Sequence, residues 1–482
     1  MTERLRAHAT FLAAVWLLVA GCDAPSVAPT DSAAARAPSV PAQPPNVVLF
    51  VADDLGWRDL ASYGNDFVDT PHLDALVAAG TRFTDAYSNG PNCAPSRASL
   101  LTGQDTPRHG ITTVAPATRG KTLHRRVLVP ETRRALREGS WTLGAAFASA
   151  GYRTASIGKW HVGASPTDYG FEQGVGGTQA GHPKSYFSPY RNSALPDGPE
   201  GEHLTARLTA EALAFLDDAA DEPFFLYLPW FAVHTPIQPR EDLLARYRER
   251  KGDDDARFPR PAYAAMVTAL DESAGAVLAK LDELGLAEET LVVFLSDNGG
   301  LGTQTEMTPL RGSKGMLYEG GVRVPLVVRW PGRVPAGQVR HEPVIGTDLA
   351  PTLLAAAGLA PPTGHVLDGT SLWPLLDGSP GGVHAERALV WHFPAYLEGN
   401  RASGRWRTTP ASAIRRGRYK LHEWLEDGAL ELYDLEEDPG EARDLAAALP
   451  EVRDALHAEL RAWRAERGAD GTLPPNPAFE TP

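Results

Sequence analysis

Two pairs of oxygen-bearing side chains follow strongly apolar runs of the sequence. Asp53-Asp54 comes directly after the run NVVLFVA, and Asp297-Asn298 comes directly after the run TLVVFLS. Ligands of open α/β folds bind at the carboxyl ends of parallel strands, so we expect these side chains to form a ligand site. An Asp after a strand can also be only a turn residue or a helix cap, and each pair alone leaves that interpretation open.

A cysteine in the body of the chain lies in the most specific segment of the sequence. Cys93 belongs to Asn-Cys-Ala-Pro-Ser-Arg-Ala-Ser-Leu-Leu-Thr-Gly, residues 92–103. Cys-x-Pro-Ser-Arg followed by Leu-Leu-Thr-Gly resembles the signature of the sulfatase family. In that family the cysteine is oxidised to the aldehyde formylglycine before folding, and the Pro and the Arg are read by the modifying enzyme. The simpler interpretation is a buried structural cysteine at the start of a helix.

Further segments resemble the other sulfatase motifs and occur in the order expected of that family. They are Asp53-Asp54, Gly158-Lys159-Trp160-His161-Val162-Gly163, Ala232-Val233-His234-Thr235-Pro236, Asp297-Asn298-Gly299 and Arg311-Gly312-Ser313-Lys314-Gly315. The resemblance covers roughly residues 45–480. It implies the alkaline-phosphatase-like fold, an α/β sandwich with a mainly parallel sheet and a small C-terminal antiparallel sheet.

The resemblance also implies a reaction, the hydrolysis of an organic sulfate monoester to an alcohol and sulfate. No ordinary side chain is both a nucleophile and a group that can later expel sulfate, whereas a hydrated aldehyde is. One hydroxyl attacks sulfur; the other then loses its proton, the carbonyl re-forms, and sulfate leaves. This is covalent catalysis, which divides one difficult step into two easier ones.

A bound divalent cation is the second implication of the resemblance. Its ligands would be Asp53, Asp54, Asp297 and Asn298, joined by an oxygen on residue 93. All of these are hard oxygen donors, which suit Ca²⁺ or Mg²⁺ and not Zn²⁺, and the resemblance favours Ca²⁺. The cation would bind a sulfate oxygen and withdraw charge as the S–O bond breaks.

Basic side chains in the matching motifs take catalytic roles by the same resemblance. Lys159 would contact sulfate or the leaving oxygen, and His161 would be the base for sulfate elimination. Both would point the same way if their segment is extended, because they lie two residues apart. His234 and Lys314 would flank and bind the leaving-group oxygen, and the sequence does not decide which of them protonates it. Arg97, one helical turn after the formylglycine, would neutralise the metal-bound carboxylates or orient that residue.

The sequence says less about the leaving alcohol. A polar, aromatic region lies between Tyr169 and Tyr190, and Trp391-His392-Phe393-Pro394 ends a predicted strand. Aromatic rings beside His or Arg suit sugar rings and anionic polymers, so we expect a sulfated sugar as substrate and His392 as one of its contacts. Ordinary packing explains both segments equally well.

Two other functions stay open at this stage. Some relatives of sulfatases share the formylglycine motif and the fold but hydrolyse phosphonate or phosphate monoesters. A phosphate dianion needs more charge compensation, and the set Lys159, His161, His234 and Lys314 favours sulfate. The other alternative is a lipoprotein that binds sulfated glycans through an inactive site, against which the intact set of motifs argues.

The elements that must position these residues alternate between strands and helices. Strands are predicted at residues 46–52, 153–157, 224–230, 290–296 and 326–330. Helices are predicted at residues 70–79, 143–150, 203–217, 263–283 and 348–357. Apolar strands that alternate with helices indicate a mainly parallel sheet covered by helices on both faces.

The pattern changes to short strands after about residue 365. A small antiparallel sheet is predicted from residues 388–391, 411–415, 418–423 and 430–433, followed by an amphipathic helix at residues 450–467. We therefore expect a catalytic domain at residues 45–365 and a smaller C-terminal subdomain at residues 366–482. The charged run Arg246–Arg257 is expected to be a solvated loop.

The first residues have the pattern of a lipoprotein signal peptide. Arg4 and Arg6 precede an apolar run, Phe11–Ala20, which is shorter than the roughly twenty residues of a membrane-spanning helix. Small residues before Cys22 resemble the bacterial lipobox, so we expect a signal peptide at residues 1–22, a lipid on Cys22 and a disordered Pro/Ala-rich linker at residues 23–44. The protein would then be exported to the periplasm or cell surface and held to a membrane only by this anchor. An ordinary signal peptide with an incidental cysteine is the alternative.

Composition narrows the classes of partner. The chain has 482 residues, with 46 Lys and Arg against 60 Asp and Glu, and a formal net charge of −14. Such an acidic protein is unsuited to non-specific nucleic-acid binding, which requires basic surfaces. Two cysteines exclude a disulfide scaffold and a Cys-rich zinc protein. The expected partners are the sulfated substrate and a formylglycine-generating enzyme.

Overall fold

Strand β1 (Asn46–Ala52) lies inside the main sheet and is buried along its whole length. The computed structural model describes residues 44–252, 258–377, 383–400 and 405–480. β1 pairs in parallel with β5 (Phe224–Pro229) and with β6 (Thr290–Ser296). Val51 lies opposite Pro229 and Ala52 lies opposite Ser296, so all three strands end at the same edge.

The main sheet has nine strands and is mainly parallel, as predicted. Its order is β4 (Gln173–Val175), β3 (Arg153–Ile157), β5, β1, β6, β7 (Arg323–Arg329), β2 (Thr81–Tyr87) and β8 (Gln338–Arg340), with β9 (Val344–Ile345) also paired to β2. Only β7 runs antiparallel to its neighbours β6 and β2 in this described sheet.

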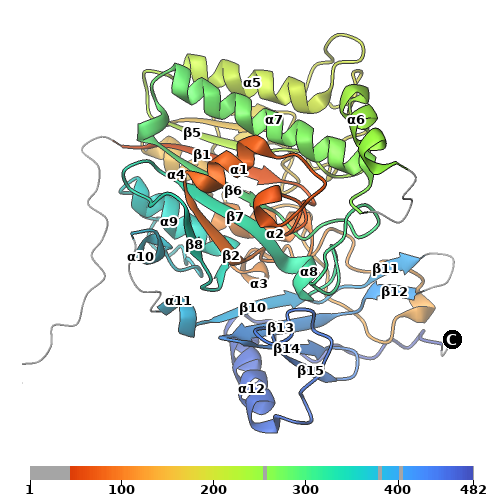
Figure 1. Ribbon diagram of the computed structural model, residues 1–482. Helices are drawn as coiled ribbons and strands as arrows, with labels where there is room; N and C mark the ends of the chain where they lie inside the picture. The colour runs from red at the N-terminus through yellow and green to blue at the C-terminus, as the bar shows by residue number, and fades with distance from the viewer. Residues whose placement is uncertain (1–43, 253–257, 378–382, 401–404, 481–482) are drawn as a thin grey trace, which may run out of the picture. The chain divides into compact units, whose positions relative to one another are not determined.

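Helices cover both faces of this sheet (Figure 1). Alternate side chains of β1, such as Val48 and Phe50, pack with the helices of one face: α1 (Pro71–Ala78), α5 (Leu204–Asp218), α6 (Glu241–Lys251) and α7 (Pro261–Glu283). Val47 and Leu49 pack with those of the other face: α2 (Cys93–Thr102), α4 (Leu143–Ser149), α9 (Leu349–Ala356) and α10 (Trp373–Leu376). Burial on both faces is the reason why the strand sequence is apolar throughout.

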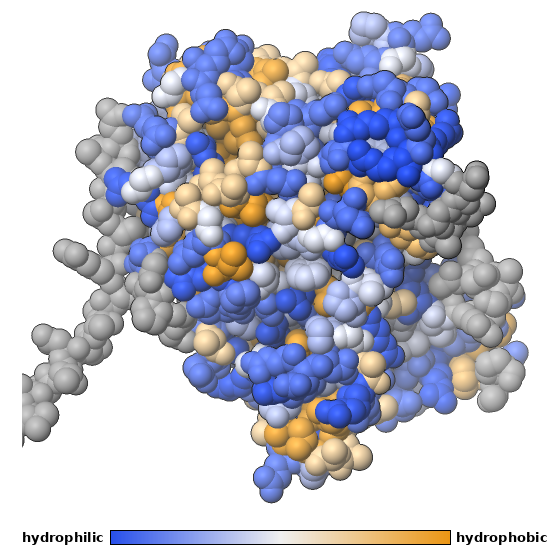
Figure 2. All heavy atoms as spheres, viewed as in Figure 1, coloured by the Kyte–Doolittle hydropathy of each residue, from blue (hydrophilic) through white to orange (hydrophobic). Residues whose placement is uncertain are grey.

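Shorter helices complete the main layer structure. They are α3 (Thr106–His109), α8 (Glu319–Val322) and α11 (Val383–Glu386), with 3₁₀ turns at Ala61–Tyr63, Thr122–His124, Pro166–Tyr169, Ala287–Glu289 and Gly346–Asp348. Within the described ranges, no helix combines the length and the apolar character that a membrane span requires. The face drawn in Figure 2 is largely hydrophilic, with hydrophobic residues confined to small areas.

A second, antiparallel sheet follows, as the sequence predicts. Its order is β10 (Ala388–Phe393), β13 (Ala411–Arg416), β14 (Tyr419–Trp424) and β15 (Leu430–Asp434), and α12 (Pro450–Glu466) packs on it through Leu456 and Leu460. The main body contacts the sheet through Trp391, whose indole N–H donates to the Ser88 carbonyl at 2.8 Å. A two-stranded hairpin, β11 (Leu397–Asn400) and β12 (Arg405–Thr408), projects beside this sheet (Figure 1).

The prediction of a solvated loop at Arg246–Arg257 is wrong for its first part. Residues 246–251 belong to α6, because Leu243, Leu244 and Tyr247 are buried against the core and fix the helix while its charged residues face outward. Residues 253–257 lie outside the described part of the chain. The predicted signal peptide, Cys22 and nearly all of the linker also lie outside it, and the domain boundary near residue 365 stays a prediction.

Candidate active site

The ends of three strands bring the first group of predicted residues together. The backbone N–H of Asp53 donates to the Ala232 carbonyl at 2.9 Å, and the Val233 N–H donates to the Asp53 carbonyl at 2.6 Å. The Asp297 N–H donates to the Ala52 carbonyl at 3.0 Å. These bonds join the loops after β1, β5 and β6, so the acid pairs and His234 share one edge of the sheet.

Cys93 is the first residue of α2 and is almost completely buried. The helix is anchored by Ala98 and Leu101, which pack into the core beneath the sheet. A helix N-terminus carries partial positive charge, which favours an anionic group at this position. The Lys314 ammonium lies 3.4 Å from the Cys93 sulfur.

Buried cations compensate the buried carboxylates. Arg97 Nε donates to Asp297 Oδ2 at 2.8 Å, and Lys159 Nζ donates to Asp53 Oδ2 at 2.6 Å. Lys314 Nζ lies 2.6 Å from Asp54 Oδ1. The main-chain carbonyl of Lys159 accepts a further bond from Arg97 Nη1 at 2.9 Å, which ties the motif after β3 to α2.

The condition under which Lys159 and His161 would point the same way, an extended segment, is not met at His161. Its φ is 66°, in the left-handed region, so the backbone at His161 is not extended. Lys159 is fully buried against Asp53, whereas His161 lines the cavity above Cys93. Both residues act on Cys93, Lys159 through its charge and His161 through a hydrogen bond.

Charge and burial shift the pKa values of the site residues. Burial disfavours the Cys93 thiolate, but Lys159 and Lys314 outweigh burial and hold the pKa of this thiol well below its usual range. Burial lowers the pKa of His161 to about 4, so this imidazole is neutral near pH 7 and able to accept a proton. Burial opposes protonation of His234, but the nearby Asp54 carboxylate outweighs it and raises the pKa of His234.

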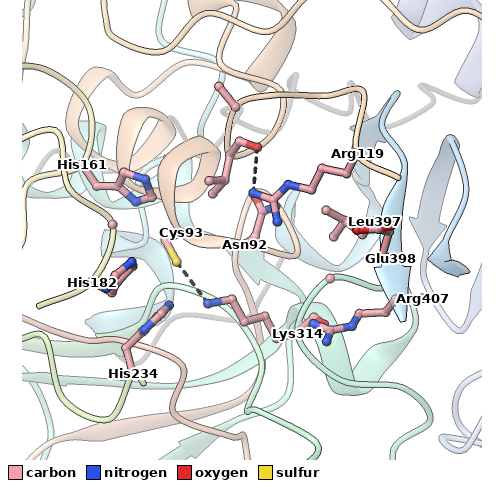
Figure 3. Close-up of a pocket in the computed structure, with 14 residues that line it drawn as sticks. Asn92, Cys93, Arg119, His161, His182, His234, Lys314, Leu397, Glu398 and Arg407 are labelled. Carbon is pink, nitrogen blue, oxygen red and sulfur yellow. Dashed lines mark hydrogen bonds between the residues drawn. The ribbon is translucent and has the colours of Figure 1, made fainter. Parts of the chain in front are cut away.

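A cavity of about 470 Å³ opens above Cys93. Figure 3 shows His161, His182 and His234 on one side, with Arg119, Leu397, Glu398 and Arg407 on the other and with Cys93 and Lys314 between them. The His182 and His234 rings are nearly parallel, with centroids 6.0 Å apart. The cavity can therefore admit a ligand whose reacting group reaches Cys93 while the remainder contacts both walls.

A group of side chains beneath the cavity is arranged so that it can hold a metal ion. Asp53, Asp54, Cys93 and His234 each offer one ligand atom, and these atoms all lie within 4.8 Å of one another. Two oxygens at this edge, Asp53 Oδ1 and Asn298 Oδ1, are buried without a hydrogen-bond partner. Buried oxygens without donors are costly unless a cation or another donor satisfies them.

The predicted ligands Asp297 and Asn298 adjoin this group through hydrogen bonds. Asp54 N–H donates to Asp297 Oδ1 at 3.3 Å, and Asn298 Nδ2 donates to Asp54 Oδ1 at 2.9 Å. His234 was not among the metal ligands predicted from the sequence, although its ring lies close to Asp53, Asp54 and Cys93.

The structure does not bring His392 to this cavity. Side chains alternate along β10, so Trp391 and Phe393 face the main body, whereas His392 Nδ1 lies 2.9 Å from Ser412 Oγ, near Arg464. His392 lines a separate pocket. The prediction that His392 contacts a substrate bound at Cys93 is therefore wrong. The aromatic region between residues 169 and 190 is mostly core, since Tyr169, Phe171, Tyr186 and Tyr190 are buried there.

Several residues that line the cavity were not identified from the sequence. They are Asn92, Arg119, His182, Leu397, Glu398 and Arg407. His182 lies inside the polar, aromatic region between Tyr169 and Tyr190, and the composition of this region could have identified His182 as a substrate contact. Arg119 and Arg407 come from loops and a hairpin with no motif around them, and only the folded chain brings them beside Cys93.

Comparison with known families gives two matches. A family model described as "Sulfatase" matches residues 45–359, which is more than half of the chain. A model described as "N-sulphoglucosamine sulphohydrolase, C-terminal" matches residues 313–466.

Individual proteins resemble the chain over most of its length. Human arylsulfatase A is 34% identical, over 90% of this chain and 90% of its own sequence. The N-acetylgalactosamine-6-sulfatase of Canis lupus familiaris is 33% identical, over 79% of this chain and 72% of its own. The crystal structure of Ps i-CgsB in complex with k-i-k-neocarrahexaose has a TM-score of 0.74 and 28% identity, and the match covers 89% of this chain and 95% of that one.

Proposed function

Since the chain belongs to the sulfatase family and is a sulfuric ester hydrolase, we propose that its substrate is a sulfated carbohydrate and that Cys93 acts as a formylglycine beside a bound Ca²⁺. One observation carries this proposal. Cys93 begins α2 at the base of the cavity, between Lys314 and the carboxylates after β1. The sugar in the proposal is supported by the name of one relative, an N-acetylgalactosamine-6-sulfatase, and by the oligosaccharide in the Ps i-CgsB complex.

Maturation of Cys93 would precede folding. In the folded chain Cys93, Pro95 and Arg97 are all buried, and Arg97 is fixed by its bonds to Asp297 and Lys159. A modifying enzyme cannot read these side chains once they are buried. The formylglycine-generating partner would therefore act on the unfolded chain.

Ca²⁺ is the proposed cation because the unsatisfied atoms are hard oxygens. The ion would be held by the side-chain oxygens of Asp53, Asp54, Asp297 and Asn298. This choice is supported by Asp53 Oδ1 and Asn298 Oδ1, which are buried without a hydrogen-bond partner. When bound, such an ion supplies Lewis-acid stabilisation of charge on a sulfate oxygen. Mg²⁺ is the second candidate, but it demands a more regular octahedral shell.

The remaining groups of the site would move protons and balance charge. His161, neutral near pH 7, is able to accept a proton from a hydroxyl at residue 93. Asp54 raises the pKa of His234, so this ring can hold a proton that a departing alkoxide needs. Lys314 lies between Asp54 and residue 93, where its charge can stabilise an anionic oxygen during either step.

A panel of esters tests the proposed function. Purified, matured protein would be assayed with defined sulfated monosaccharides, 4-nitrophenyl sulfate and 4-nitrophenyl phosphate, with Cys93→Ala as the matched inactive variant. We expect sulfate release that Cys93→Ala abolishes, and much slower release of phosphate. Preferred hydrolysis of the phosphate would instead support the phosphomonoester alternative, and no desulfation of any sugar would refute the carbohydrate assignment.

The proposal includes an exported enzyme that is held to a membrane by a lipid on Cys22. It is supported by the apolar run and the small residues before this cysteine. Cells expressing the protein would be labelled with radioactive palmitate, with Cys22→Ala as the control. Equal labelling of both proteins, or of neither, would contradict the anchor.

A further inference from the structure

The cavity wall that faces the three histidines is basic. It carries Arg119 and Arg407 together with Leu397 and Glu398, and Figure 3 shows both arginines on the side of Lys314 away from His161. Glu398 is the one carboxylate among the described residues that line the cavity. Two arginines against one carboxylate leave this wall with a net positive charge in a protein whose net charge is −14.

The wall is built by close docking of the β11–β12 hairpin. Trp406 of this hairpin packs so near Gly120 that a Cβ there would lie 2.4 Å from the ring. A Cβ on Gly315, next to Lys314, would lie 2.9 Å from both Arg407 Cδ and Leu397 Cδ1. Gly120 and Gly315 both have positive φ, which favours glycine, and both lie against the hairpin. The hairpin therefore packs directly on the loop that carries Arg119 and on the loop that carries Lys314.

Further contacts hold the hairpin in place. The rings of Tyr396 and Trp406 have centroids 4.7 Å apart, and the Tyr396 hydroxyl donates to Glu426 and accepts from the Val127 N–H. The Tyr396 N–H donates to the Ala117 carbonyl at 3.1 Å. A rigidly supported side chain binds a ligand with less loss of conformational entropy than a mobile one.

Lys314 and Arg407 differ in how far their charges are compensated. Lys314 is paired with Asp54 at 2.6 Å. Arg407 donates to the Lys314 carbonyl at 3.3 Å, and no carboxylate in the described part of the chain lies within ion-pair distance of it. That carbonyl uses one N–H of the Arg407 guanidinium and leaves others for a ligand. Arg119 donates to the Val114 carbonyl at 3.2 Å, which orients its guanidinium at the wall.

We propose that Arg119 and Arg407 form a second anion-binding subsite, which recognises another sulfate or carboxylate group of the sugar whose sulfate is cleaved at residue 93. Planar guanidinium groups bind such anions in a bidentate manner. The natural substrate is then a sulfated sugar with at least one further negative charge. This inference rests on the proposed function and specifies its substrate class.

The arrangement of the cavity agrees with such a ligand. Cys93 and Lys314 lie between the histidine wall and the arginine wall, so the two anionic groups of one sugar can be held at once (Figure 3). A cavity of about 470 Å³ falls within the range of small-molecule sites and can hold at least one sugar ring with its substituents.

The test compares substrates that differ in their second charge. Matured enzyme would be assayed with 4-nitrophenyl sulfate, a monosulfated monosaccharide, a disulfated monosaccharide and a monosulfated disaccharide that contains a uronic acid. The last two distinguish a second sulfate from a carboxylate. The variants are Arg119→Gln, Arg407→Gln and Arg407→Lys, and the matched control is Arg416→Gln, an exposed arginine of β13 paired with Glu459.

We expect kcat/KM of the Gln variants for multiply charged sugars to fall about 10-fold to 100-fold, mainly through KM, as the loss of charged hydrogen bonds predicts. The loss for the two singly charged esters should be at least about tenfold smaller. Arg407→Lys should retain part of the preference for multiply charged sugars, because lysine keeps the positive charge but lacks the two parallel N–H groups of the guanidinium. Arg416→Gln should not change this preference.

Two results would overturn the subsite. One is an equal loss for singly and multiply charged esters, which would mean that Arg407 acts only by supporting the Lys314 loop. The other is preference of the unaltered enzyme for singly charged sugars. Failure to release sulfate from any ester would instead refute the proposed function. Unchanged urea-unfolding curves of the variants would show that they are folded.

Discussion

Replacing Arg97 tests whether the buried carboxylates of the site depend on it. Arg97 is fully buried in α2, donates to Asp297 at 2.8 Å and to the Lys159 carbonyl at 2.9 Å, and lies 4.0 Å from Asp53. Arg97→Met keeps much of the length and volume of the side chain but removes its charge and its donors. The variant therefore leaves Asp297 buried beside other carboxylates without its cation.

The expected loss of stability follows from these contacts. Two hydrogen bonds to a charged group contribute about 1.5–3 kcal/mol each, or about 3–6 kcal/mol together. Removal of one partner of a buried ion pair costs about 3–5 kcal/mol, because the other charge stays buried and unpaired. We therefore expect Arg97→Met to lower the free energy of unfolding by about 3–5 kcal/mol without divalent cations.

Urea titration followed by tryptophan fluorescence, in EDTA, measures this loss. Arg416→Gln is the matched control, because it breaks an exposed pair with Glu459 and should cost no more than about 1 kcal/mol. A loss for Arg97→Met no larger than that of the control would refute the reasoning. It would mean that Asp297 is compensated by other groups, and that Arg97 is not the structural counterion of the site.

The remaining predictions concern the cation, one lysine and one histidine. Complete chelation should abolish sulfate release and Ca²⁺ should restore it better than Mg²⁺; full activity in protein shown by elemental analysis to be metal-free would contradict this. Lys314→Met should lower kcat at least about 100-fold, whereas Lys280→Met, at a lysine of α7 that pairs with Asp217, should not, and similar rates for both would remove Lys314 from the chemistry. Burial lowers the pKa of His392 to about 3, while the unfolded value is about 6.5, so the unfolded chain binds this proton more strongly and stability falls as the pH drops below about 6.5. His392→Gln should make the free energy of unfolding less sensitive to acid by about 1 kcal/mol between pH 6.5 and pH 5.5, and equal pH slopes in urea titrations would contradict it.

The sequence predicted the strands that are buried on both faces most accurately. The predicted bounds of β1 and β6 agree with the structure, because continuous apolar runs are most stable inside the sheet. The predicted bounds of β3 also agree, although its sequence, RTASI, is not a continuous apolar run. β2 was missed because its sequence, TRFTDAY, is largely polar. Asp85 of β2 forms ion pairs with Arg323 and Arg415, which are distant in the sequence. The residues around Asp85 do not predict these partners.

Some residues of the site lie in sequence motifs and could be predicted, whereas others come together only in the folded chain. Asp53, Cys93 and Lys314 lie in motifs, and the structure brings them together. Arg119 and Arg407 have no motif, since their position depends on how the β11–β12 hairpin docks. His392 was misplaced because strand alternation decides its direction, and the sequence alone did not fix which face of β10 meets the main body.

The most direct test of the central claim is the mass of the tryptic peptide Phe83–Arg97, measured alongside kcat. Preparations made with and without a formylglycine-generating enzyme would contain different fractions of aldehyde and thiol at residue 93. We predict that sulfate release per molecule rises in proportion to the aldehyde fraction and vanishes when only the thiol is present. Full activity in protein whose peptide carries only unmodified Cys93 would contradict the account.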